Sequence, residues 1–464
     1  MKFTLPKDAF PAMNVSRELR EQLVDEADTI VKEMVAANET FISHGSKLEY
    51  RHWKLVRAID GIQVFRQRKK AINQRDDGCL GPVIQSPSWS QNHSFLRYNT
   101  ATDRQMTSCS SSGIGEDTIM ERMRPRDVAL IALNGTMDGT LNDCMFGCFA
   151  PTDVTWMLRS SHVNDHLADA RVLATIRGPT HHDPCRFLGV KWFAKEIPLM
   201  LAGIVQQRDF LIVESSGFTR DSKDERVGYF LMHSMTLREI PELTHLGMIR
   251  GLMSFCYVFR QNGPSKVDVF CRGFFDSRGA VPGRLSVSFA AESIVACANV
   301  VDYAYIKKLR WLVNNSLKQN QRNLTDKSRS NRCGACEKSF AKHLQSMFGT
   351  GTACQICHLF VCSKCSVSKK ITMDVSETGA VQQRSFHFCL SCVMNVKQQS
   401  GWDMALSSLE TSSRSTASSV SSSASGGLPS IPQKVSYRRD DFGNSGVEAA
   451  TTNWQSAGDS TGRQ

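Results

Sequence analysis

Residues 354–365 read CQICHLFVCSKC, which places two Cys-x2-Cys pairs only four residues apart. A third pair, Cys333 and Cys336, precedes this stretch, and a fourth, Cys389 and Cys392, follows it. Each pair can present two thiolates from one tight turn, and zinc prefers four such soft ligands in a tetrahedron. Eight ligands predict two closed, structural zinc sites within residues 333–392, and so small a domain needs their binding energy to fold.

The spacing also suggests how the pairs are shared between the two ions. Because only four residues separate Cys357 from Cys362, adjacent pairs cannot easily chelate the same ion, and a crossed arrangement is more natural. The predicted ligands are Cys333, Cys336, Cys362 and Cys365 for one zinc and Cys354, Cys357, Cys389 and Cys392 for the other. Coincidental turns or a redox motif are the alternatives, and the crowding of four pairs argues against both.

The module resembles the FYVE-type zinc finger, which also has four Cys-x2-Cys pairs with four residues between the second and the third. Phe340 and Phe360 look like further family positions. The resemblance implies two crossed zinc sites, small hairpins and a short final helix. It also implies docking to endosomal membrane through phosphatidylinositol 3-phosphate.

The chain departs from that family where the lipid head group would bind. The family has a basic Arg-[Arg/Lys]-His-His-Cys-Arg strand around the third cysteine, whereas residues 350–355 read TGTACQ. His387-Phe388-Cys389 replaces the family's Arg-Val-Cys, and the tryptophan before the first cysteine is absent, although Asp326 resembles the aspartate that accompanies it. Because no arginine or histidine is in place to clamp a phosphate, the sequence argues against specific recognition of this head group.

A looser attachment to anionic lipid stays open. Met347 and Phe348 occupy the segment that inserts into membranes in the FYVE family, although packing inside a small domain explains them equally well. The basic residues that could meet lipid are Lys338, Lys342, His343, Lys369 and Lys370.

A RING-like ubiquitin ligase is the main alternative for the module, because such domains also bind two zinc ions in a crossed arrangement. They usually place a histidine in the second ligand pair. Here that pair is Cys354 and Cys357, and His358 is left outside the ligand set.

Residues 50–300 have the composition of a domain with both strands and helices. The expected strands are His52–Ala58, Gly61–Gln67, Val128–Leu133, Arg186–Ala194, Asp209–Ser215, Gly228–Met235 and Lys266–Phe275. The first two are close enough for a tight hairpin around Asp60 and Gly61. Residues 246–262 fit either a strand or a buried helix, and Asp153–Leu158 begin a helix capped by Thr152.

Residues 289–315 carry the strongest helical pattern of the chain. The apolar residues that recur at steps of three or four are Ile294, Ala298, Val301, Tyr305, Leu309 and Leu312. A long amphipathic helix after a run of strands needs a surface for its apolar stripe, and a curved sheet offers one. A second helix is predicted near the N-terminus, starting at Ser16 and docking on the domain.

These features together resemble the START family of helix-grip lipid-transfer domains. They are the strands around Trp53 and Val64, Arg208-Asp209-Phe210 before a strand, Val267–Phe275 before turn residues, and Lys308, Leu309 and Trp311 in the last helix. The resemblance implies an α+β fold in which a curved antiparallel sheet wraps on a long C-terminal helix. It also implies a hydrophobic tunnel between them for a lipid or another apolar ligand. We interpret Arg208 and Asp209 as a structural pair that fixes a loop.

The histidines do not predict an enzyme. His162 and His166 have the spacing of a helical zinc pair, but Val163 stands where an H-E-x-x-H metalloprotease needs its glutamate. Residues 181–183 (HHD) lie between prolines and predict an exposed turn. The sequence has no GxSxG motif and no phosphate-binding loop. We therefore expect no catalysis.

The net charge of +11 is concentrated locally, since residues 306–332 hold eight Lys and Arg and one acid. Such a stretch attracts anionic surfaces, or it is simply a solvated helix face and linker. It lacks the interleaved aromatic residues of a nucleic-acid platform, which argues against nucleic acid as a partner.

The chain therefore predicts five parts. These are an N-terminal helical segment (1–45), a START-like domain (46–315), a basic linker (316–332), the zinc finger (333–395) and a Ser-rich disordered tail (396–464). The pairing resembles FYVE/START-like proteins of oomycete type. We expect a cytoplasmic, non-catalytic adaptor, peripheral on endosomal membrane. The alternative is a protein-interaction scaffold without lipid specificity.

Overall fold

The computed structural model describes most of the chain. Its residues are 4–6, 9–68, 118–163, 165–197, 205–279, 281, 283–296, 299–320, 332–340, 351–376 and 380–420. The chain divides into the units Met1–Ser413 and Arg414–Gln464, and the fold below lies in the first. Met347, Phe348, Lys342, His343 and the tail beyond Val420 lie outside the described residues.

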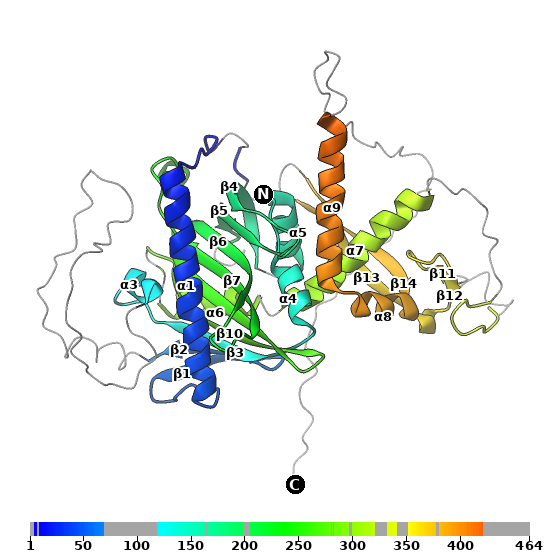
Figure 1. Ribbon diagram of the computed structural model, residues 1–464, viewed down its shortest axis with the longest axis horizontal. Helices are drawn as coiled ribbons and strands as arrows, with labels where there is room; N and C mark the ends of the chain where they lie inside the picture. Colours follow the sequence, from blue (N-terminus) through cyan, green and yellow to red (C-terminus); the bar gives the residue numbers. More distant parts are fainter. Residues whose placement is uncertain are drawn as a thin grey trace, which may run out of the picture. The chain divides into compact units, whose positions relative to one another are not determined.

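One ten-stranded sheet forms the body of the first unit (Figure 1). In sheet order its strands are β1 (Trp53–Ile59), β2 (Ile62–Gln67), β3 (Ile131–Asp138), β10 (Lys266–Asp276), β9 (Leu252–Asn262), β7 (Arg226–Ser234), β6 (Arg208–Arg220), β5 (Phe187–Lys195) and β4 (Leu167–Arg177). Neighbours along this path pair antiparallel, and the short β8 (Ile249–Arg250) pairs parallel with β6. Residues 246–262 are thus mainly a strand.

The predicted hairpin between β1 and β2 is confirmed. Asp60 and Gly61 both have positive φ, at 46° and 81°, as a two-residue hairpin turn requires. This turn brings the tip of the hairpin beside β3, because Ile62 pairs with Gly135. A side chain at position 135 would meet the Gly61 carbonyl oxygen at 2.4 Å, so glycine permits the close approach.

The two faces of the sheet are covered by different helices. Helix α1 (Arg17–Ser43) packs on one face, where Ala27 and Ile30 join a cluster with Leu231. Its predicted start is confirmed, since Ser16 Oγ accepts a hydrogen bond from Leu19 N at 3.1 Å. The neighbouring Phe230 belongs to the cluster of the opposite face, as strand alternation demands. The short α3 (Ile119–Met123) lies beside α1.

Four helices cover that opposite face. They are α4 (Leu141–Cys148), α5 (Asp153–Val163), α6 (Gly283–Ala296) and α7 (Val300–Asn320). Thr152 caps α5 as predicted, because its Oγ1 accepts from Thr155 N at 3.2 Å. The predicted α+β fold, an antiparallel sheet packed on C-terminal helices, is confirmed.

The single helix predicted over 289–315 is wrong in one respect. The helix breaks between Ala296 and Val300, and the two halves are bent by 45°. Helix α7 crosses α4 so closely that a side chain at Gly147 would meet the Val300 carbonyl oxygen at 2.0 Å. The break lets α6 follow the sheet while α7 turns across α4, and the apolar period of three and four residues continues through it.

The C-terminal module is built from small elements, and α7 supplies part of its core. Its elements are β11 (Thr352–Ala353), β12 (Phe360–Val361), β13 (Ser366–Val375), β14 (Val381–Cys389) and α8 (Leu390–Gln398). Leu309 and Val313 of α7 pack in one cluster with Phe388 and Val396 of the module. The helix that ends the START-like body therefore continues into the predicted linker and into this module.

The prediction of disorder from residue 396 onward is wrong for its first part. Helix α9 (Gly401–Val420) begins after Ser400, whose Oγ accepts from Asp403 N at 3.3 Å. Met404 and Ala405 are buried in the core of the sheet-and-helix body. The serine-rich composition predicted disorder, although a few apolar residues in this segment are enough to dock the helix on the core.

None of the described helices alone is long and apolar enough to cross a bilayer. Leu285–Ala296 and Val300–Ser316 reach that length and composition only when taken together across their bend.

Candidate metal centres and ligand pockets

The structure gathers the eight predicted cysteine ligands into two clusters. One holds Cys333, Cys336, Cys362 and Cys365, and the other holds Cys354, Cys357, Cys389 and Cys392. Within each cluster all sulfur atoms lie within 4.8 Å of one another. Among the described residues, these are the groups of three or more His, Cys, Asp and Glu that could hold a metal ion. The pairs are combined in the crossed order that the spacing predicted.

The sulfur separations fit a tetrahedral ion. Cys336 Sγ lies 3.9 Å from Cys362 Sγ, and Cys357 Sγ lies 3.8 Å from Cys389 Sγ. Four sulfurs at about 2.3 Å from one zinc ion are about 3.8 Å apart. Each cluster would be closed by its four thiolates, which leaves no position for a reacting water. An ion there would therefore be structural.

Backbone N–H groups favour the thiolate form of Cys333 in the first cluster. Burial would raise the pKa of the Cys333 thiol, but hydrogen bonds from the backbone outweigh it and lower that pKa to about 6. The strongest of these comes from Cys362 N, 3.3 Å from Cys333 Sγ. In the second cluster Cys392 N donates to Cys389 Sγ at 3.3 Å. Metal ions bind the thiolate, so these donors suit a metal site.

The first and second pairs sit in similar turns. Glu337 and His358, each directly after the second cysteine of its pair, have φ of 59° and 60°. Their N–H groups donate to the carbonyl oxygens of Cys333 and Cys354 at 2.8 and 2.9 Å. His358 is not a ligand in either cluster, and its Nε2 instead lies 2.8 Å from Ser316 Oγ of α7.

The hairpin of β13 and β14 is fastened to α5 and α7 by polar contacts. His162 Nε2 accepts from Thr372 N at 3.3 Å, and Ser161 Oγ lies 2.9 Å from Thr372 Oγ1. Arg310 of α7 donates to the Met373 carbonyl oxygen at 2.9 Å. The two folded parts therefore share an interface within the first unit.

His162 has a role that the sequence did not reveal. It does not pair with His166, which lies beyond the end of α5 with a φ of 53°. Burial, followed by the charge of Arg310, lowers the pKa of His162 to about 4. The imidazole is therefore neutral at pH 7, as an acceptor for Thr372 N must be. In the other histidine motif, His181 and His182 form an exposed bend as predicted, whereas Asp183 is half-buried and accepts hydrogen bonds from Cys185 N and Phe218 N.

A small cavity lies between the sheet and the helices, where the tunnel was expected. Its volume is about 60 Å³. Its aromatic and apolar lining includes Trp156, Phe193, Phe230, Met232, Tyr257 and Phe275, and its polar lining includes Arg159, Asp165 and Lys195. Such a volume holds about two waters, so the expected open tunnel is wrong for this conformation. Ring packing closes the interior, with the Phe193 and Phe210 centroids 4.9 Å apart.

A buried group of charges lies behind the wall of this cavity, and only its Arg159 is a lining residue. Lys191 Nζ is 2.5 Å from Glu214 Oε1, and Arg159 Nη2 is 3.7 Å from Glu214 Oε2. Burial lowers the pKa of Lys191 to about 8, although the Glu214 carboxylate opposes this shift. Lys191 also donates to the Ala150 carbonyl oxygen at 2.8 Å. The interior thus combines a mostly apolar lining with a few fixed polar groups.

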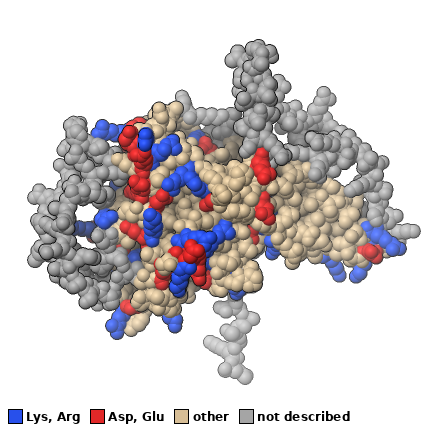
Figure 2. All heavy atoms as spheres, viewed as in Figure 1, with Lys and Arg blue, Asp and Glu red and all other residues tan. Residues whose placement is uncertain are grey.

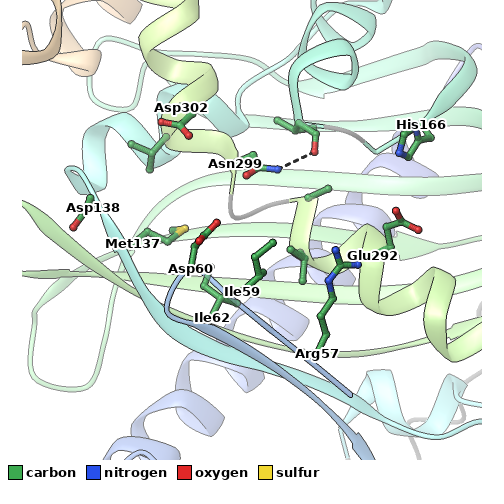
Figure 3. Close-up of a pocket in the computed structure, with 14 residues that line it drawn as sticks. Arg57, Ile59, Asp60, Ile62, Met137, Asp138, His166, Glu292, Asn299 and Asp302 are labelled. Atoms are coloured by element: carbon green, nitrogen blue, oxygen red, sulfur yellow. Dashed lines mark hydrogen bonds between the residues drawn. The ribbon is translucent and has the colours of Figure 1, made fainter. Parts of the chain in front are cut away.

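A larger pocket of about 600 Å³ opens beside the break between α6 and α7 (Figure 3). The turn between β1 and β2, the end of β3 and the segment after α5 complete its wall. Its polar residues are Arg57, Asp60, Asp138, His166, Glu292, Asn299 and Asp302. Sequence patterns gave no sign of this pocket, because its residues come from five separate segments.

Arg208 and Asp209 are structural, though not as a pair with each other. Arg208 donates to the carbonyl oxygens of Ser277 and Arg278, both at 3.1 Å, and so holds the turn after β10. Asp209 accepts from Arg250 Nε at 2.8 Å and from Trp192 Nε1 at 2.7 Å.

No protein-family model and no curated protein matches the sequence. Solved START-related structures are similar to it. Human STARD10 is 10% identical, with 62% of this chain and 88% of that chain covered and a TM-score of 0.35. Human StAR-related lipid transfer protein 5 is 14% identical, with 62% and 97% covered and a TM-score of 0.34. The lipid transfer and protein localization domain of human StarD13 is 10% identical, with 57% and 95% covered and a TM-score of 0.32.

Proposed function

We propose that this chain is a non-catalytic adaptor. It holds an apolar ligand of lipid type between its sheet and helices, and a module with two zinc ions docks it to a membrane. The observation that carries the proposal is the cavity beneath α5 and α6, which is lined by aromatic and methionine side chains with a few charged groups. At about 60 Å³ the cavity is closed, so the packed rings of its lining have to move apart to admit a lipid. Ligand sites in proteins commonly have this composition, in which the polar groups orient a mostly apolar ligand.

Zinc is the metal that the two Cys₄ clusters favour. Tetrahedral thiolate sites suit zinc. When four protein ligands fill every coordination position, the ion stabilises the fold and does not take part in catalysis. The second shell is present too, since backbone N–H groups reach Cys333 Sγ and Cys389 Sγ.

The environment of His162 supports a non-enzymatic role, because its imidazole accepts a structural hydrogen bond from Thr372 N. His166, the other histidine of that spacing, does not pair with it and instead lines the pocket beside the helix break.

The exposed surface of the zinc module supports docking to anionic membrane. Leu359, Leu390 and Met394 are 49%, 48% and 55% exposed, although they are large and apolar. The exposed basic side chains nearby in the chain are Lys364, Lys369, Lys370 and Arg384. Figure 2 shows a largely uncharged surface over this module, with Lys and Arg at its outer end. Exposed apolar groups flanked by cations suit a lipid surface with negative head groups.

Recognition of phosphatidylinositol 3-phosphate is not part of this proposal. Thr352 and Ala353 form β11 where the FYVE family has its basic strand. Both residues are exposed, and neither is basic. A scaffold that binds only proteins is the second candidate, and the missing basic strand is the observation in its favour.

One liposome experiment tests both parts of the proposal. The full chain, loaded with zinc, is incubated with phosphatidylserine liposomes that carry trace fluorescent lipids, and the liposomes are then pelleted. We expect protein in the pellet at low salt, less at high salt, and about one fluorescent lipid per chain extracted into the supernatant.

Matched variants separate the two readouts. Met232→Trp fills the cavity and should abolish extraction, whereas Val154→Trp, at an exposed position of α5, should not. Leu390→Asp with Met394→Asp should abolish pelleting, whereas Leu246→Asp should not. Absence of extraction for every lipid sinks the ligand proposal. Absence of protein from the pellet at both salt concentrations would contradict membrane docking and favour the protein-binding scaffold.

A further inference from the structure

The pocket beside the helix break has a floor that differs from its rim. The floor consists of buried apolar side chains from β2, β3 and the helices, namely Ile62, Met137, Val163, Val295, Ala296 and Val301. The charged residues of the rim are exposed. A pocket of about 600 Å³ with this division suits a molecule that has one apolar and one polar end.

The charges of the rim are unbalanced. Figure 3 shows Asp60, Asp138 and Asp302 on one side, and Arg57 with Glu292 on the other. On the second side the two charges are of opposite sign, whereas the first side carries three carboxylates and no labelled cation. Among the ion pairs of the described residues, none neutralises any of these three. Carboxylates gathered over an apolar floor concentrate cations in the space between them.

The pocket also adjoins the interior cavity. Val163 and Ala296 line both spaces, so these two side chains form the partition between them. The partition stands where Asn299 Nδ2 donates to the Val163 carbonyl oxygen at 3.3 Å, which joins the helix break to α5. A chain that passed between Val163 and Ala296 would reach the aromatic lining of the cavity.

We propose that the ligand of this protein is a cationic amphiphile, a single apolar chain that ends in an amine or a quaternary ammonium. Its head group lies against Asp60, Asp138 and Asp302, and its chain lies on the apolar floor and passes between Val163 and Ala296 into the interior, which widens to admit it. This inference rests on the proposed ligand-binding function and names the chemical class of the ligand.

The test compares probes that share one chain length. Dodecylamine and dodecyl sulfate below their micelle concentrations, and dodecanol below its solubility limit, are titrated into the zinc-loaded full chain, and binding is followed by calorimetry. We expect the amine to bind about tenfold more tightly than the alcohol, because three exposed carboxylates each add a modest attraction. The sulfate should bind more weakly than the alcohol, and high salt should reduce the preference for the amine.

A neutralised variant assigns the preference to the rim. Asp60→Asn, Asp138→Asn and Asp302→Asn together should leave dodecanol binding unchanged and remove the advantage of the amine. The matched control neutralises three exposed acids elsewhere, Glu18→Gln, Asp25→Asn and Asp127→Asn, and should retain that advantage. Equal loss in both variants would overturn the assignment.

The remaining outcomes distinguish a failure of this inference from a failure of the proposed ligand-binding function. Equal binding of amine and alcohol overturns the cationic head group but keeps an apolar ligand. Binding of ethylamine as tight as that of dodecylamine overturns the path into the interior. If none of the three dodecyl probes binds, the proposed ligand-binding function itself fails.

Discussion

The imidazole of His162 shows how one side chain can tie the stability of the interface to pH. Its pKa is about 4 in the fold, lowered by burial and then by Arg310, against 6.5 ordinarily. Between these values the unfolded chain binds a proton that the folded chain does not, so stability rises with pH there. The contribution is complete above about pH 6.5 and is lost as the pH falls to about 4, by at most about 3 kcal/mol.

We predict that His162→Gln flattens this part of the pH dependence. On moving from pH 7.5 to pH 5, the free energy of unfolding of the wild type should fall by about 2 kcal/mol more than that of the variant. Urea denaturation of the zinc-loaded chain measures this difference, and metal release at low pH is common to both proteins. His181→Gln, in an exposed bend, should behave like the wild type. Parallel pH profiles for wild type and His162→Gln would refute the role given to this imidazole.

Single residues were predictable where the chemistry is local. The ligand order of the eight cysteines follows from four residues between Cys357 and Cys362, a constraint visible in the sequence. The partner of His162 is Thr372, 210 residues away, so no local pattern could reveal their contact. The carboxylates at the rim of the pocket beside the helix break were missed too, because they come from segments that are far apart in the sequence.

At the scale of elements, α7 is held by a buried lysine that reaches α4 and the junction between α8 and α9. Lys308 is 0% exposed, and its Nζ lies 2.6 Å from Asp143 Oδ1 of α4. It also donates at 2.6 Å to the Gln399 carbonyl oxygen, between α8 and α9. Removing one member of such a pair leaves the other as an uncompensated buried charge.

We predict that Lys308→Met destabilises the chain by about 3–5 kcal/mol. The double variant Lys308→Met with Asp143→Leu should recover much of this loss, because both buried charges are then gone. Urea denaturation of the four proteins of the cycle measures the coupling. Lys32→Met, an exposed lysine of α1, serves as the control. A single variant as stable as that control would contradict the assigned role of Lys308.

Elements with strong periodicity were predictable, and those set by distant packing were not. The strands within 186–275 and the start of α1 match the sequence patterns closely. Strand β4 was missed because its buried positions include Ala168, Asp169 and Ala170 rather than large apolar residues. Helix α9 was missed because Trp402 packs on Phe218, with ring centroids 5.4 Å apart, and that contact joins parts far apart in the chain.

At the scale of the whole unit, α7 connects the two pockets to the cysteine clusters. Val300 and Val301 at its start line the two pockets, and Leu309 and Val313 further along pack in the C-terminal module. Helix α5 makes a second connection, since it lines the cavity and contacts β13. Where such shared helices couple two sites, each site changes the binding affinity of the other by the same factor.

We predict that removing zinc with a chelator weakens ligand binding severalfold and lowers the melting temperature. Loss of the ions should unfold the module and take away the packing of Leu309 and Val313, so α7 would fray toward the pocket. Calorimetric titration of dodecylamine into chelated and zinc-restored protein measures the first effect. Unchanged affinity after verified metal loss would show that the two parts are independent.

The helix break also bears on where an engineer can divide this protein. A cut at residues 321–331 looks natural in the sequence, yet it would deprive the C-terminal module of Leu309 and Val313, both almost fully buried in its core. A fragment that begins at Val300, directly after the break, keeps both side chains but leaves the buried Lys308 without Asp143. Its first turn would still carry one wall of the ligand pocket, so any recipient of the zinc module would inherit part of a binding site with it.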